Sequence, residues 1–114
     1  MAKKGYIGEY KAKKELQAIY GDDNVIKIAI AQIGADFMVI KDHKLILLVE
    51  VKETIKNKYY PKPRERLQFE RIRQFAEANS TRAELWIYHR KGIGRPVQKV
   101  VSMIYSLPKS SGFI

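Results

Sequence analysis

The stretch Leu45–Lys52, which reads LILLVEVK, decides the fold because it has the pattern of a strand that is apolar on both faces until its end. Such a run is typical of a central strand that other elements cover on both sides. Side chains alternate along a strand, so Glu50 and Lys52 point to the same face. The stretch therefore predicts a covered sheet with a carboxylate and an ammonium together at its rim.

Helical and strand-like patterns alternate on either side of this stretch. Apolar residues recur at helical spacing over residues 6–20, where Gly21 ends the pattern, and again over residues 64–79. Strands are predicted at residues 24–30, 35–40, 45–52, 84–89 and 97–105. The expected order is αβββαββ, which predicts an α/β fold with three layers, a mixed central sheet flanked by helices.

Length and composition limit the classes of protein. The 114 residues predict a single domain, residues 1–114, with residues 106–114 as a loose C-terminal tail. Without cysteine and with only two histidines, any metal is expected to be held by oxygen atoms. No apolar stretch approaches the ~20 residues that span a bilayer, so we expect a soluble, cytoplasmic protein without membrane contact.

The charge points to a polyanionic partner. Lys and Arg total 22 against 12 Asp and Glu, giving a formal net charge of +10. Such an excess favours nucleic acid as the partner, although basic residues that serve only solubility are the alternative.

Asp36, in the stretch Gly34–Val39, is expected to join Glu50 across two neighbouring strands. The two carboxylates share a face only if paired residue numbers add to an even total, as when Asp36 lies opposite Glu50. A turn with an odd number of residues meets this condition, either three residues (Asp42, His43 and Lys44) or five. A slip by one residue would separate the carboxylates.

Two further polar residues lie on stripes that are otherwise apolar. Glu9 precedes Ala12 by three residues on the first helix, and Gln68 begins the stripe of the second helix. For Glu9 the alternative is a carboxylate that stabilises the first turn of the helix. For Gln68 the alternative is a side chain that satisfies backbone groups at the helix start.

Hydrolysis of a phosphodiester with Mg²⁺ requires two acidic oxygen donors to hold the metal and a cation or base near the attacking water. Mn²⁺ is expected to substitute for Mg²⁺. Asp36, Glu50 and the Val51 carbonyl are the candidate metal ligands, with Glu9 as a further acid. Lys52 would orient the attacking water and neutralise charge. The alternative is a surface ion pair of Glu50 with Lys52 or Lys41, which contributes little.

The chain resembles the PD-(D/E)xK nuclease superfamily, and more narrowly the archaeal-type Holliday junction resolvases, which are cellular or viral. The matching pieces are Lys4-Gly5-x-x-Gly8-Glu9, Gly34-Ala35-Asp36-Phe37-Met38-Val39, Leu47–Lys52, and Gln68 with Phe75-Ala76. The resemblance covers most of residues 3–90. It implies a restriction-endonuclease-like fold and a Mg²⁺-dependent, homodimeric hydrolase of DNA recombination and repair that cuts four-way junctions. Its catalytic set would be Glu9, Asp36, Glu50 and Lys52.

The chain departs from those relatives in two places. Tyr10 and Lys11 follow Glu9 where relatives often have arginine, and the loop before Asp36 is shortened to residues 31–34. The short loop puts junction selectivity in question more than cleavage, and Gln32 is a candidate to lie near the scissile phosphate. Because two symmetric cuts need two sites, a C2 dimer is expected. Phe69, Phe75, Trp86 and the apolar ends of the fourth and fifth strands are the candidate interface residues, and burial in the core is the alternative for each.

Basic and aromatic residues flank the expected site and predict the DNA contacts. They are Lys3, Lys4, Lys11, Lys14, Lys56, Lys58, Tyr59, Tyr60, Lys62 and Arg64. Three functions remain open from the sequence: a junction-resolving endonuclease, a related nuclease acting on duplex, flap or single-stranded DNA, and a noncatalytic nucleic-acid-binding protein.

Overall fold

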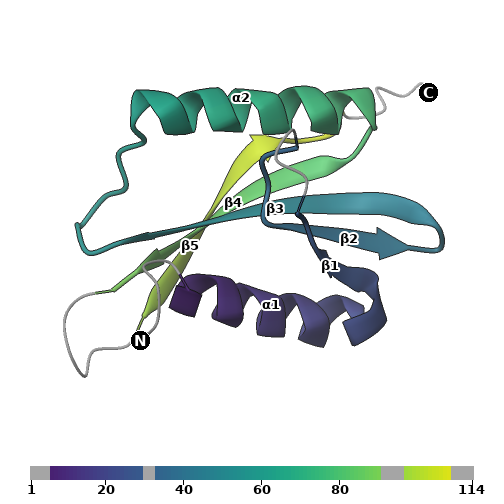
Figure 1. Ribbon diagram of the computed structural model, residues 1–114, viewed down its shortest axis with the longest axis horizontal. Coiled ribbons are helices and arrows are strands. Elements are labelled where there is room, and N and C mark those ends of the chain that lie inside the picture. Colours follow the sequence, from purple (N-terminus) through teal and green to yellow (C-terminus); the bar gives the residue numbers. More distant parts are fainter. Residues whose placement is uncertain (1–5, 30–32, 91–96, 109–114) are drawn as a thin grey trace.

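The computed structural model describes residues 6–29, 33–90 and 97–108. In it a five-stranded mixed sheet lies between two helices, which gives three layers (Figure 1). The helices are α1 (Tyr6–Tyr20) and α2 (Pro63–Ala78), and a short 3-10 helix, η1 (Asp22–Asn24), follows α1. The strands are β1 (Val25–Lys27), β2 (Phe37–Lys41), β3 (Lys44–Thr54), β4 (Arg82–His89) and β5 (Gln98–Tyr105). The predicted order of helices and strands is confirmed.

The strands lie in the sheet in the order of the chain, with β3 at the centre. All neighbours are antiparallel except β3 and β4, which are parallel. A parallel pair requires a crossover connection, and α2 provides it. This arrangement places α2 on one face of the sheet and α1 on the other (Figure 1).

The core has two halves, one on each face of β3. Leu47, Val49 and Val51 pack in the half that α1 covers, whereas Leu48 packs with Ile72 of α2. The apolar LILLV run is therefore buried on both faces, as expected of a central strand. Glu50 and Lys52 follow Leu48 on the α2 face, at the end of the strand.

The β2–β3 turn differs from the expected three or five residues. Lys41 pairs with Lys44, so the turn has only two residues, Asp42 and His43. This even number would separate Asp36 from Glu50, but the register shifts between Val39 and Ile40, and an extra residue in β3 restores the even total. Phe37 pairs with Val49 and Met38 with Leu48, as required. The predicted turn was wrong and the predicted register is confirmed.

The two turn residues adopt positive φ angles, 52° for Asp42 and 64° for His43. Two-residue hairpin turns with positive φ at both positions favour Asn-Gly, because side chains with a Cβ atom are strained there. We expect the double substitution Asp42→Asn, His43→Gly to raise the free energy of unfolding by about 1 kcal/mol. Urea unfolding measures this change. His43→Ala keeps the Cβ and should bring no gain; equal stabilisation by this control would contradict the explanation.

Several boundaries differ from the prediction. The expected strand over residues 24–30 is β1, which ends at Lys27, and residue 30 lies outside the described part of the chain. Asp36 lies in a bend just before β2, where Gly34 has φ +83° and the Asp36 carbonyl accepts the Ile28 N–H at 2.9 Å. Ser106–Pro108 has no regular structure, and residues 109–114 of the expected tail are not among those described.

Helix α2 begins at Pro63, one residue earlier than predicted. Proline suits the first helical position because its missing N–H would have no partner there. The Glu65 carboxylate accepts the Lys62 N–H at 2.9 Å and so closes the first turn. Neither helix in the described residues is long and apolar enough to cross a membrane.

Candidate active site

The carboxylate of Asp36 is fixed at the entrance of β2 beside the end of β3. The Oδ2 atom accepts the Val51 N–H at 2.8 Å, and the backbone N–H of Asp36 donates to the Val49 carbonyl at 3.0 Å. These bonds hold Asp36 next to Glu50, as the register of Phe37 with Val49 requires. The expected pair of acids is therefore brought together by adjacent strands.

Glu50 is a buried carboxylate, and one of its oxygens has no partner in the part of the chain that the structure describes. Only 2% of the residue is exposed. Its Oε2 atom accepts from Gln68 Nε2 at 2.7 Å and lies 3.1 Å from Lys52 Nζ, whereas Oε1 has no hydrogen-bond partner among residues 6–29, 33–90 and 97–108. Burial and the neighbouring charge of Asp36 raise the pKa of Glu50 to about 8, although Lys52 opposes the shift. A cation bound between Asp36 and Glu50, in addition to Lys52, would offset both the burial of the Glu50 charge and its repulsion by Asp36.

Lys52 is held by three side chains. Its Nζ atom lies 3.1 Å from Glu50 Oε2, 3.1 Å from Gln68 Oε1 and 3.5 Å from Glu65 Oε2. Sequence reasoning missed Glu65. The signal that could have found it is its position in the first turn of α2, the helix that follows Glu50 and Lys52 in the chain. The arrangement fixes the ammonium on the α2 face of the sheet, as the alternation along β3 predicts.

Gln68 points inward from α2, as predicted. Its Nε2 atom donates to Glu50 and also to the Gly34 carbonyl, at 2.6 Å. Gln68 therefore does satisfy a backbone group, but in the loop before Asp36 and not at the helix start. One amide thus ties together the loop, the buried acid and Lys52.

Glu9 reaches the site from α1 through a residue that sequence reasoning missed. Its Oε1 atom lies 2.5 Å from Lys27 Nζ, which is also 3.3 Å from Asp36 Oδ1. Burial alone would lower the pKa of Lys27, but the bond to Glu9 and the charge of Asp36 raise it overall. A lysine within the apolar stretch VIKIAI was the signal for this bridge.

The cluster has the donor chemistry that Mg²⁺ prefers, although it is not a complete cage. No three His, Cys, Asp or Glu side chains converge as a metal-binding group in residues 6–29, 33–90 and 97–108. Asp36 and Glu50 supply carboxylate oxygens, and the partnerless Glu50 Oε1 is a buried atom that a cation would satisfy. Mg²⁺ commonly takes only one or two protein carboxylates and keeps several waters. The Val51 carbonyl and Glu9 remain predicted ligands.

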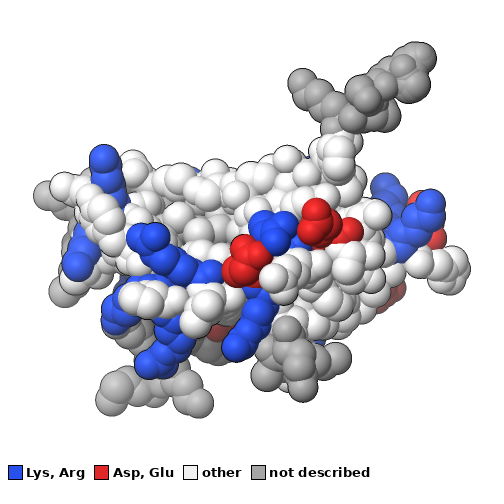
Figure 2. Space-filling model, turned by 90° about the horizontal axis from the view of Figure 1, so that it is seen from above, with Lys and Arg blue, Asp and Glu red and all other residues white. Residues whose placement is uncertain are grey.

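Two clefts meet at Lys52, Lys62 and Glu65. One, of about 710 Å³, runs along the start of α2, and the other, of about 540 Å³, lies over the end of β3. The first is lined by Gly34, Lys52, Lys62, Pro63, Arg64, Glu65, Leu67, Gln68 and Arg71. Figure 2 shows basic side chains gathered at one end of the molecule, whereas acidic and basic side chains adjoin near its middle. Lys52 therefore lines both clefts.

The predicted DNA contacts lie in different environments. Lys11, Lys14, Lys56, Lys58, Tyr60, Lys62 and Arg64 are exposed. Tyr59 is half-buried, its ring centroid 6.5 Å from that of Phe69, and burial raises the pKa of its phenol. Lys3, Lys4 and Gln32 lie outside the described residues.

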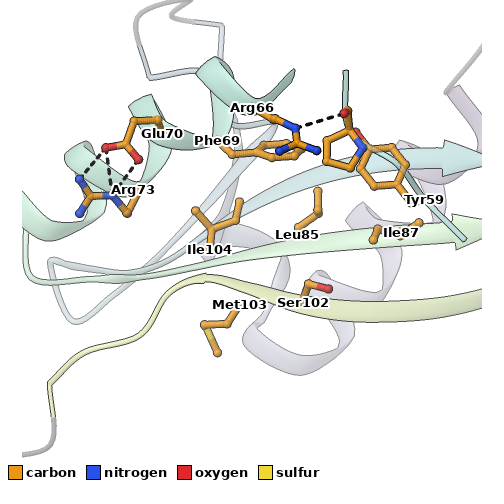
Figure 3. A pocket seen from close by; sticks show the side chains of 11 residues that line it. Tyr59, Arg66, Phe69, Glu70, Arg73, Leu85, Ile87, Ser102, Met103 and Ile104 are labelled. Carbon is orange, nitrogen blue, oxygen red and sulfur yellow. Dashed lines mark hydrogen bonds and ion pairs between the residues drawn. The ribbon is translucent and has the colours of Figure 1, made fainter. Parts of the chain in front are cut away.

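A third cleft, of about 540 Å³, opens between α2 and the strands β4 and β5 (Figure 3). Phe69 and Tyr59 line it on one side and Leu85, Ile87 and Ile104 on the other. Arg66, Glu70 and Arg73 of α2 also line it, and Tyr59 lines both this cleft and the cleft over the end of β3. Asp36, Glu50 and Lys52 of the candidate site are not among the residues that line this third cleft.

A scan against models of known protein families finds no match for this sequence, and a search of curated proteins finds none.

Proposed function

We propose that the protein is a Mg²⁺-dependent, structure-selective endonuclease that resolves four-way DNA junctions by paired phosphodiester cleavage. The observation that carries this proposal is the convergence of Asp36, just before β2, with Glu50 and Lys52 of β3, where one buried Glu50 oxygen lacks a partner among the described residues. The proposed preference for junctions rests on the sequence resemblance alone.

The chain's own residues divide the work of hydrolysis. The Val51 N–H and Gln68 hold the two carboxylates in place, so that their orientation is set before substrate arrives. Lys52 orients the attacking water and neutralises charge that develops on the phosphate. Bound Mg²⁺ would supply the Lewis acid that activates water and stabilises the leaving oxygen. Glu9 and Lys27 form a further ion pair at the rim of the sheet, beside Asp36.

Binding to DNA should weaken steeply with salt, because the contacts proposed around Lys52 are ion pairs with phosphates. The logarithm of the association constant should fall by ~0.9 for each tenfold rise in salt, per phosphate neutralised on duplex DNA. Lys62→Gln with Arg64→Gln should reduce this slope, and the exposed Lys41→Gln, distant on the β2–β3 hairpin, is the control. Fluorescence anisotropy at several salt concentrations measures the slope, and a slope near zero would remove the electrostatic argument.

Paired cleavage also requires two sites, so the proposal includes a homodimer. Trp86 is only 3% exposed and packs in the α1 half of the core, so the alternative of core burial holds for this residue. The exposed apolar side chains of the edge strand β5, Val100, Val101 and Met103, are better placed to meet a second copy. Sedimentation at micromolar concentration tests the dimer, and full junction activity from a monomer would contradict it.

The noncatalytic alternative has an observation in its favour. Lys27 and Lys52 already pair with the acids, so a basic protein could use the cluster for stability alone. Labelled four-way junction, linear duplex and flap DNA, each with Mg²⁺ and with chelator, separate the possibilities. Symmetric cuts confined to the junction support the proposal, and broad cutting supports a related nuclease. Retention on the DNA without cleavage supports the binding protein.

A further inference from the structure

We propose that Glu53 is a positioning residue that anchors the N-terminus of α1 and thereby holds Glu9 against Lys27 and Asp36. Glu53 follows Lys52 on β3 but, by alternation, belongs to the opposite face of the sheet, where Val51 packs under α1. The role of Glu9 as a site residue rests on the proposed function, whereas the anchoring of α1 does not.

The Glu53 side chain is only 8% exposed, and both of its oxygens are engaged. Oε2 accepts the Gly8 N–H at 3.1 Å, and Oε1 lies 3.2 Å from Arg90 Nη1. Gly8 lies in the first turn of α1, where backbone N–H groups have no partner within the helix. A carboxylate at this end also complements the positive end of the helix dipole. Glu53 thus caps the helix from a distant strand.

Gly8 allows this close approach because it has no side chain. A Cβ atom at this position would lie 2.9 Å from Glu53 Cγ and 3.2 Å from its Oε2. Any larger residue would push the first turn of α1 away from β3 or displace the carboxylate. The glycine and the acid therefore form a matched contact.

The contact continues directly into the candidate site. Glu9 is the next residue after Gly8, its Oε1 lies 2.5 Å from Lys27 Nζ, and Lys27 lies 3.3 Å from Asp36 Oδ1. One strand, β3, thus presents Glu50 and Lys52 on one face and fixes the place of Glu9 from the other. Movement of the first helical turn would carry Glu9 away from Lys27.

The side-chain ammonium signal of Lys27 in ¹⁵N NMR tests the anchoring without metal or DNA. An ammonium held in ion pairs exchanges its protons slowly enough to be seen, so we expect the signal in the wild type. Glu53→Ala and Gly8→Ala should weaken or abolish it, as should Glu9→Gln. Glu53→Gln keeps an acceptor for the Gly8 N–H and should restore it. A wild-type Lys27 signal in Glu53→Ala would overturn the proposal.

Mn²⁺ titration calorimetry tests the link to the site. We expect Glu53→Ala to weaken Mn²⁺ binding by roughly 10-fold, as loss of a supporting contact to a metal ligand typically does. Glu9→Gln combined with Glu53→Ala should bind no more weakly than Glu9→Gln alone, since the two residues act in series. Additive losses would show that Glu53 does not act through Glu9 and would overturn its positioning role.

A matched control separates positioning from general stability. Glu70→Ala removes an exposed ion pair with Arg73 on α2, away from the site, and should leave both the Lys27 signal and Mn²⁺ affinity unchanged. Thermal unfolding measures whether each variant is folded at the temperature of the NMR and calorimetry experiments. A wild type that binds no Mn²⁺ would overturn the proposed function, and the Lys27 signal would still decide whether Glu53 anchors α1.

Discussion

Asp36→Asn is expected to lower the rate of junction cleavage by roughly a thousandfold, on the order of the loss of a major electrostatic contribution to a hydrolytic site. The amide keeps an oxygen that can accept the Val51 N–H, so the local fold should survive. It removes the negative charge that, with Glu50, would hold the metal. Single-turnover cleavage of a labelled junction at saturating protein measures the effect.

Binding gives the internal comparison for this substitution. Affinity for the junction in the presence of chelator should change little, because DNA binding depends on the basic surface. Asp23→Asn, an exposed acid on η1, is the matched control and should cleave as the wild type does. Normal cleavage by Asp36→Asn would show that the metal-ligand assignment is wrong.

With chelator present, the free energy of unfolding should fall as the pH rises from about 5 to about 8. Burial and the charge of Asp36 raise the pKa of Glu50 from 4.5 to about 8, so the folded state binds a proton that the unfolded state has already released. The stabilisation is complete below the unfolded pKa and is lost as the pH rises through the folded pKa. The slope is at most on the order of 1.4 kcal/mol per pH unit.

Urea unfolding at several pH values with chelator measures this dependence. Glu50→Gln cannot titrate and should remove most of the slope, while its amide remains able to bond to Gln68. Added Mg²⁺ should recover more stability at pH 8 than at pH 5, because only the ionised carboxylate binds the cation. A wild-type stability that is flat or rises over this window would contradict the account of Glu50.

The arrangement of the fold was predictable from the sequence because its signals are local. Alternation along LILLVEVK and the helical spacing of Ala12 and Leu16 are direct consequences of strand and helix geometry. The compensation between the short turn and the extra residue in β3 was not predictable. Turn type and bulge depend on side-chain packing between β2 and β3, which a one-dimensional pattern does not contain.

The candidate site was predictable where its residues lie within one element or on adjacent strands. Glu50 and Lys52 follow from strand alternation, and Gln68 follows from the stripe of α2. Lys27 and Glu65 were missed because their roles arise only when β1 and the start of α2 approach the end of β3. Glu53 has the same origin, since its partner Gly8 is 45 residues distant in sequence.

Residue-resolved Mn²⁺ titration followed by NMR tests most directly whether Asp36 and Glu50 form a divalent-cation site. The paramagnetic ion broadens the amide signals of residues close to it. We expect the signals of Asp36, Glu50 and Val51 to broaden first, with no such effect in Asp36→Asn. Broadening that begins at exposed acids such as Glu70 and Glu77, and spares Val51, would contradict the central claim.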